Sequence, residues 1–178
     1  MNRLSLTVIA AMSVVLPVAA QDNPMANEAR QSWGRTMSNV IAAAEKMPEE
    51  NYSFKPAPES QSFRDLVAHT ADSAMGTCTA YSGERKTAGA ASMQSKAELV
   101  AALKAAGAAC EAAYGSFTDA KATEMIAGRG GQNSRIGYLY RNTIHIEHEY
   151  AQMAVHLRLK GVVPPSSEGR GPGMGKKK

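Results

Sequence analysis

The sequence predicts an all-α protein folded as a four-helix bundle with up-down-down-up connectivity. Four segments repeat apolar residues at helical spacing, and no stretch alternates apolar and polar residues as a half-buried strand does. Short or moderate connections join these segments, which is typical of a helical bundle. With 178 residues, the chain is also long enough for one domain with a substantial core.

The first 20 residues have the pattern of a secretory signal peptide. Arg3 precedes the apolar run LSLTVIAAMSVVLPVAA, and Val18, Ala19 and Ala20 form a small-residue cleavage site. The run is short for a membrane span and contains Pro17, so the alternative of an uncleaved membrane anchor is less favoured. Cleavage after Ala20 would give a periplasmic or secreted protein with no stable membrane association.

The net charge of the chain lies outside the predicted domain. The formal net charge is +4, but one basic residue lies in the leader, and the segment 166–178 holds four basic residues and one acidic residue. The remaining segment, 21–165, has 15 basic and 15 acidic residues. A neutral domain argues against nucleic-acid binding, which needs a basic stripe. Residues 166–178 are rich in Gly, Pro and Lys, and we expect a disordered tail there.

The first helix is predicted from about Asn27 to Met47, where Pro48 ends it. Its apolar residues at helical spacing are Trp33, Met37, Val40, Ile41 and Ala44. The linker that follows contains two prolines and shows no helical periodicity, so no helix is predicted there.

The second and third helices have recognisable ends. The second is predicted to begin near Ser60 or Ser62 and to end near Ser82, where Gly83 stops it. The third opens with a Ser-Lys-Ala-Glu capping box at 95–98 and continues through a segment rich in small residues. Those small side chains allow close approach of a neighbouring helix.

The fourth helix follows a predicted glycine-rich loop at 128–131. It runs from about Ser134 to Lys160, and Gly161 is a suitable C-terminal stop. The two prolines at 164–165 prevent the helix from continuing.

The two cysteines of the chain indicate how the helices connect. Cys78 lies about 16 residues into the second helix and Cys110 about 14 residues into the third. In an antiparallel hairpin these depths would differ by about 15 Å of helical rise, whereas in a parallel pair they are level. An up-down-down-up bundle would therefore let a disulfide form in an oxidising compartment. The alternative is a pair of buried free thiols.

A metal site between two helices is the leading functional hypothesis. The chain has four histidines, and His145, His148 and Glu149 cluster on the fourth helix. Pairs separated by three or four residues on a helix can reach one ion, so His145 pairs with either Glu149 or His148. His69 lies on the second helix at a comparable level if the two helices are antiparallel neighbours. Such ligands leave coordination positions open, as in catalytic sites.

The alternative reading is structural. Histidines on helix flanks commonly form hydrogen bonds, and His-Glu pairs are often surface ion pairs; a non-catalytic binding or structural bundle is then the competing class. We expect His156 to be a packing or surface residue and Asp72 to be solvated. The zincin motif is not present, because Gln152 stands where its second histidine would be.

The segments SFRDLVAHTADSAMGTCTAYSGE, NTIHIEHEY and LRLKGVVPPSS, in this order and spacing, resemble the exported branch of the DinB family. The resemblance covers about residues 27–167. It implies an up-down-down-up four-helix bundle and a divalent metal, commonly zinc or nickel, held by three histidines. His69 and His145 match two of these positions. The third falls on Glu149, because the Glu-His-Tyr order of similar sequences is here His148-Glu149-Tyr150.

The resemblance also implies a class of activity. Related proteins include thiol-dependent transferases and isomerases, so a small-molecule substrate or thiol is an expected partner, and a homodimer is an expected assembly. A carboxylate oxygen can replace an imidazole on zinc. The metal set is therefore expected to be His69 and His145, completed by Glu149 or His148, or to be degenerate.

Overall fold

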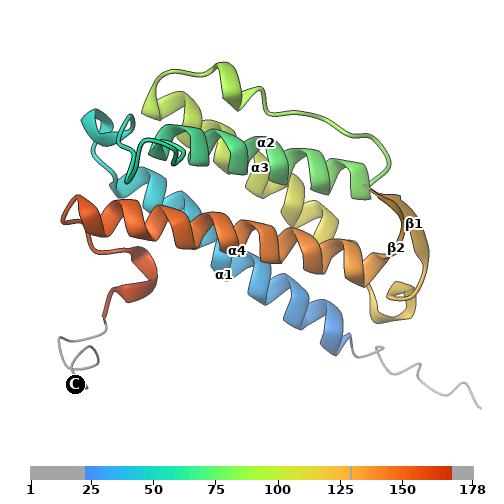
Figure 1. Ribbon diagram of the computed structural model, residues 1–178. Helices are drawn as coiled ribbons and strands as arrows, with labels where there is room; N and C mark the ends of the chain where they lie inside the picture. Colours follow the sequence, from blue (N-terminus) through green and yellow to red (C-terminus); the bar gives the residue numbers. More distant parts are fainter. Residues whose placement is uncertain (1–22, 129, 170–178) are drawn as a thin grey trace, which may run out of the picture.

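The computed structural model describes residues 23–128 and 130–169, and four long helices dominate them. They are α1 (Pro24–Lys46), α2 (Phe63–Tyr81), α3 (Lys96–Gly115) and α4 (Arg135–Leu159). Figure 1 shows α1 and α4 running in one direction and α2 and α3 in the other, which confirms the up-down-down-up bundle. No helix in the described ranges has both the length and the apolarity of a membrane span. The predicted signal peptide, 1–20, lies outside the described residues.

Side-chain caps fix the beginnings of three helices. The Ser62 hydroxyl accepts a hydrogen bond from the Asp65 amide at α2, and the Ser134 hydroxyl accepts one from the Gly137 amide at α4. The capping box predicted at 95–98 is formed at α3. These local signals are the reason that the predicted starts agree with the observed starts within about three residues.

The first helix begins earlier than the sequence pattern predicts. Pro24 is its first residue, and the carboxylate of Asp119 accepts hydrogen bonds from the amides of Met25 and Ala26, at 3.1 and 2.8 Å. A helix N-terminus has free N–H groups, and here a residue more than 90 positions away satisfies two of them. Local pattern cannot reveal that contact.

The predicted disulfide is confirmed. Cys78 of α2 is bonded to Cys110 of α3, with their Cα atoms 4.9 Å apart and both residues fully buried. The bond joins two parallel helices at the same level, as the residue depths predicted. The alternative of free thiols is wrong, and the described residues hold no free cysteine.

Asp72 is not simply solvated, which corrects the prediction. Its carboxylate accepts hydrogen bonds from the Thr87 hydroxyl at 2.8 Å and from the amides of Ala90 and Ala91 at 3.1 Å. These groups belong to the long connection that returns the chain from the end of α2 to the start of α3, through η2 (Ala90–Ser92). Asp72 therefore anchors the crossover connection that the parallel α2–α3 pair requires. Figure 1 shows this connection running from the end of α2 to the start of α3.

Replacing Asp72 with alanine is expected to lower the free energy of unfolding by about 1–3 kcal/mol, because three donors lose a charged acceptor. Burial alone would raise the pKa of Asp72, but the hydrogen bonds from Thr87, Ala90 and Ala91 outweigh it and lower the pKa below its ordinary value. The stabilisation is thus present at neutral pH and lost as the pH falls below about 4. Urea titrations at pH 7 and pH 3 test this, with the exposed Glu84→Ala as control. An equal loss at both pH values would contradict it.

A short hairpin replaces the predicted glycine-rich loop. β1 (Met125–Gly128) pairs antiparallel with β2 (Gly131–Ser134), a hairpin that the sequence pattern did not predict. Each strand has four residues, and half of these eight residues are exposed. Backbone hydrogen bonds hold the two strands together, so the sequence carries no apolar alternation that would predict them. Gly128 is required there, because a Cβ at this position would lie 2.5 Å from Asn133 Nδ2 and 2.9 Å from the Tyr138 ring. The hairpin thereby sits close against the start of α4.

The folded domain continues past the predicted boundary at residue 165. The Ser166 amide donates to the Tyr150 hydroxyl at 2.9 Å, and Arg158 donates to the Ser167 hydroxyl at 3.1 Å. Glu168 pairs with Lys46 of α1. Residues 166–169 therefore belong to the bundle and not to a disordered tail, because α4 and α1 offer them polar partners. Residues 170–178 lie outside the described part of the chain.

Candidate metal centre

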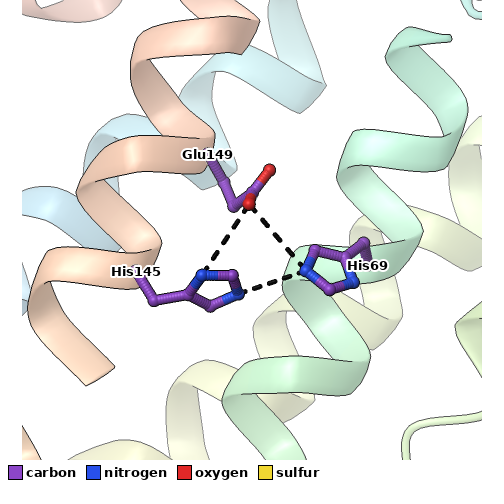
Figure 2. Close-up of side chains that lie close together, drawn as sticks. All are labelled: His69, His145 and Glu149. Carbon is purple, nitrogen blue, oxygen red and sulfur yellow. Dashed lines mark hydrogen bonds and ion pairs between the residues drawn. The ribbon is translucent and has the colours of Figure 1, made fainter. Parts of the chain in front are cut away.

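Two histidines from different helices meet in the groove between α2 and α4. The Nε2 atoms of His69 and His145 lie 3.2 Å apart, and their rings are perpendicular with centroids separated by 5.1 Å. Figure 2 shows both rings directed toward one point, with Glu149 above them. The separation of 76 residues in the chain is closed by the antiparallel packing of α2 and α4. The predicted convergence of His69 and His145 is confirmed.

Glu149 completes the group from one turn further along α4. Its Oε1 atom lies 3.8 Å from His69 Nε2 and 3.8 Å from His145 Nδ1 (Figure 2). The Glu149 side chain is only 6% exposed, while those of His69 and His145 are 47% and 36% exposed. Within the described chain, the only charge partners of this buried carboxylate are the two imidazoles. A buried carboxylate is unfavourable without a cation.

Gln152 holds the carboxylate in this orientation. Its Nε2 atom donates to Glu149 Oε2 at 3.2 Å, which leaves Oε1 facing the imidazoles. The sequence interpretation noted Gln152 only as a residue that breaks the zincin motif. Its position three residues after Glu149 on one helix is the signal that would have indicated this contact.

The other two histidines do not join the group. His148 has an exposed side chain and lies outside the cluster of ligand atoms found among the described residues. His156 is 3% exposed, and its ring nitrogens lie 2.9 Å from the Gln152 carbonyl and 3.1 Å from the Gln61 carbonyl. His156 therefore packs and bridges the linker to α4, as expected of a structural residue.

The electrostatic surroundings keep His145 in the form that a metal requires. Burial lowers its pKa below the ordinary value of 6.5; the Glu149 carboxylate opposes that shift, and His69 and His148 add to it. A neutral imidazole is the form that coordinates a metal, and a proton on the ring competes with the metal. His145 is thus predominantly neutral at physiological pH.

The donor set fits a divalent transition metal. One ligand atom from each of His69, His145 and Glu149 lies within 4.8 Å of the others. Ligand atoms on tetrahedral zinc, with bonds of about 2.0–2.1 Å, are about 3.3–3.4 Å apart, so small side-chain rotations bring the three into range. Two nitrogens and one oxygen are a known catalytic zinc set that leaves positions open.

A cleft of about 250 Å³ extends from the histidine pair toward the hairpin. His69 and His145 line one part of it, and α2, α4, β2 and the connection after α2 contribute the rest. The remaining lining residues are Ser73, Thr77, Arg85, Asn133, Tyr138, Arg141 and Asn142. None of these was singled out from the sequence, since each is an isolated polar or aromatic residue until the helices pack.

Comparison with known proteins agrees with the fold. One similar structure is a DinB-like protein from Bacillus cereus ATCC 10987, with a TM-score of 0.67 and 19% identity over 78% of this chain and 95% of that one. Another is the DinB-like protein YjoA from Bacillus subtilis, with a TM-score of 0.61 and 20% identity over 76% of this chain and 92% of that one.

A third similar structure is YfiT from Bacillus subtilis, described as a probable metal-dependent hydrolase with an unusual four-helix bundle topology. Its TM-score is 0.64, with 15% identity over 83% of this chain and 94% of that one. No curated protein matches the chain. The family pattern of the DinB superfamily matches residues 32–153, which span α2, α3 and most of α1 and α4. The chain belongs to the DinB superfamily.

Proposed function

We propose that this protein is a metal-dependent enzyme in which His69, His145 and Glu149 hold one divalent cation, with zinc or nickel as the expected metal. The observation that carries the proposal is the convergence of two imidazoles from α2 and α4 on a buried carboxylate that has no Lys or Arg partner among the described residues. If these three side chains served only to stabilise the fold, a buried carboxylate without a Lys or Arg partner would be an unfavourable choice.

The reaction class that fits best is transfer or hydrolysis on a small molecule. A bound cation would supply Lewis acidity, polarising a thiol, water or carbonyl. Glu149 would offset the charge of such a cation from the buried side, and Gln152 orients the Glu149 carboxylate. The exposed face of His69 opens toward the cleft, where Ser73 and Thr77 offer hydroxyl groups to a substrate. The description of YfiT as a probable metal-dependent hydrolase supports this class, and the sequence resemblance supports a low-molecular-weight thiol as a reactant.

Metal analysis of the purified full chain tests the proposal. After loading with zinc or nickel and removal of excess metal, one equivalent per chain is expected. The Glu149→His variant then separates two readings of the unusual ligand. Weaker binding means that the carboxylate is a working ligand, whereas much tighter binding favours the alternative of a binding bundle with a degenerate site. Absence of bound metal after both loadings would overturn the proposal.

We also propose that the protein is exported and cleaved after Ala20. The Cys78–Cys110 disulfide supports this, because such bonds persist mainly in oxidising compartments. Mass spectrometry of the protein recovered from the periplasm or medium is expected to find Gln21 as the first residue. Recovery of the uncleaved chain in the cytoplasmic fraction would contradict it.

Replacing Gln152 with leucine is expected to weaken zinc binding by about 10–100-fold without removing a ligand, as is usual when a group that orients a metal ligand is lost. Competition with a zinc-sensitive dye measures the change in dissociation constant. His148→Ala is the matched control on the same helix, because its side chain is exposed and outside the cluster. If both variants bind zinc as the wild type does, Gln152 has no role in orienting Glu149.

A further inference from the structure

Two arginines without carboxylate partners line the cleft beside the histidine pair. Arg85 follows α2 and Arg141 lies on α4, and neither forms an ion pair with a carboxylate among the described residues. By contrast, two basic residues close to Arg85 and to Arg141 in the sequence are paired: Lys86 with Glu84, and Arg135 with Glu124. The cleft lining itself contains no Asp or Glu. Its charge is therefore positive at the end away from Glu149.

The guanidinium group of Arg85 lies against α2 at Gly76. A Cβ at residue 76 would lie 3.0 Å from Arg85 Nη2 and 3.1 Å from Cζ, so the absence of a side chain there allows this close approach. Gly76 lies seven residues after His69, which is about 10 Å along the helix axis. Arg141 lies one turn before His145 on the antiparallel α4. Both guanidinium groups are thus displaced from the histidines in the same direction.

Asn142 lines the same cleft and has a buried acceptor atom without a hydrogen-bond partner. Its Nδ2 atom donates to Tyr114 Oη at 3.3 Å and contacts the disulfide sulfurs of Cys78 and Cys110 at 3.5 and 3.9 Å. Its Oδ1 atom is buried and has no hydrogen-bond partner, although the residue is only 3% exposed. A buried acceptor without a partner is unfavourable, and a ligand that donates an O–H or N–H to it would remove that penalty.

We propose that the cleft binds a small organic acid. Its carboxylate lies at Arg85 and Arg141, a hydroxyl or N–H group donates to Asn142 Oδ1, and its other end reaches the His69–His145 pair. Arginine suits carboxylates because its planar group donates two parallel hydrogen bonds. The volume of about 250 Å³ suits a ligand smaller than a drug-sized molecule. The placement of the other end of the ligand at the histidine pair rests on the proposed function. The contacts of its carboxylate with the two arginines and of its donor group with Asn142 do not require a metal.

The test uses the metal-free full chain and two matched probes. L-malate carries two carboxylates and a hydroxyl, whereas succinate is the same acid without the hydroxyl. We expect malate to bind, and the Arg85→Gln and Arg141→Gln variants each to bind it about tenfold more weakly. Lys86→Gln is the control, because it removes the same charge from an exposed neighbour of Arg85. All three substitutions are at exposed positions, and thermal unfolding confirms that each variant folds.

A second measurement tests the role of Asn142 without a variant. In ¹⁵N NMR spectra of the wild type, malate is expected to shift the side-chain amide of Asn142 more than succinate does and to bind several-fold more tightly. Inorganic phosphate is expected to bind more weakly than malate; equal binding would mean a general anion site and would overturn the organic-acid assignment.

Failure of malate to bind, or equal weakening in Lys86→Gln, would also overturn the inference. Because no metal is present, these outcomes are separate from the fate of the proposed metal site. A chain that binds malate through Arg85 and Arg141 but takes up no zinc would retain this inference and lose the proposed function.

Discussion

Replacing His69 or His145 with alanine is expected to abolish stoichiometric zinc binding. Each substitution removes one of three ligands, so the affinity should fall by more than the roughly 10–100-fold loss that follows from changing an orienting group. His69 is the ligand that α2 would supply, and His145 is one that α4 would supply. The two variants therefore test separately whether each helix contributes to one metal site. Metal content after loading, measured by mass spectrometry, gives the answer directly.

Glu149→Gln provides the third arm of this experiment. It retains the shape of the side chain and removes the buried charge, so zinc affinity should fall as in the histidine variants. In the metal-free protein, its free energy of unfolding should equal or exceed that of the wild type, because the carboxylate is buried without a strong cation partner. His148→Ala should retain one equivalent of zinc. Retention of full metal content in the His69 or His145 variant would refute the assigned ligand set.

Removing the disulfide is expected to have the largest effect on stability. Cys78 and Cys110 are separated by 32 positions, and closing a loop of this length stabilises the folded state by about 3–4 kcal/mol in the chain-entropy model. For a domain of this size, the Cys78→Ala/Cys110→Ala variant should melt roughly 6–16 °C lower. Thermal unfolding followed by circular dichroism measures the difference.

Chemical reduction distinguishes the effect of losing the disulfide bond from the effect of replacing the two cysteine side chains. Dithiothreitol should lower the melting temperature of the wild type and leave that of the double variant unchanged. An identical melting temperature in oxidised wild type and double variant would show that the parallel α2–α3 pair does not depend on the bond. The disulfide also contacts Asn142, so malate binding provides a second readout of its loss.

Several parts of the fold could be predicted from the sequence because their causes are local. The Ser62, Ser95 and Ser134 caps satisfy amides within the next three residues, so the helix starts are encoded where they occur. The parallel arrangement of α2 and α3 followed from the equal depths of Cys78 and Cys110. In contrast, the start of α1 depends on Asp119, and the hairpin depends on backbone pairing, so neither was predicted.

The candidate site divides in the same way. The sequence by itself identified His69, His145, Glu149 and His148 as candidate ligands, because helical spacing and the family resemblance single out these side chains without any coordinates. Only the tertiary structure places Glu149, and not His148, beside the two imidazoles, with Gln152 donating a hydrogen bond to its carboxylate. The tertiary structure also shows that Arg85, Arg141 and Asn142 line one cleft, which the sequence did not indicate. The physical reason is that spacing fixes which face of one helix a residue occupies, whereas the neighbour of that face depends on how separate helices pack.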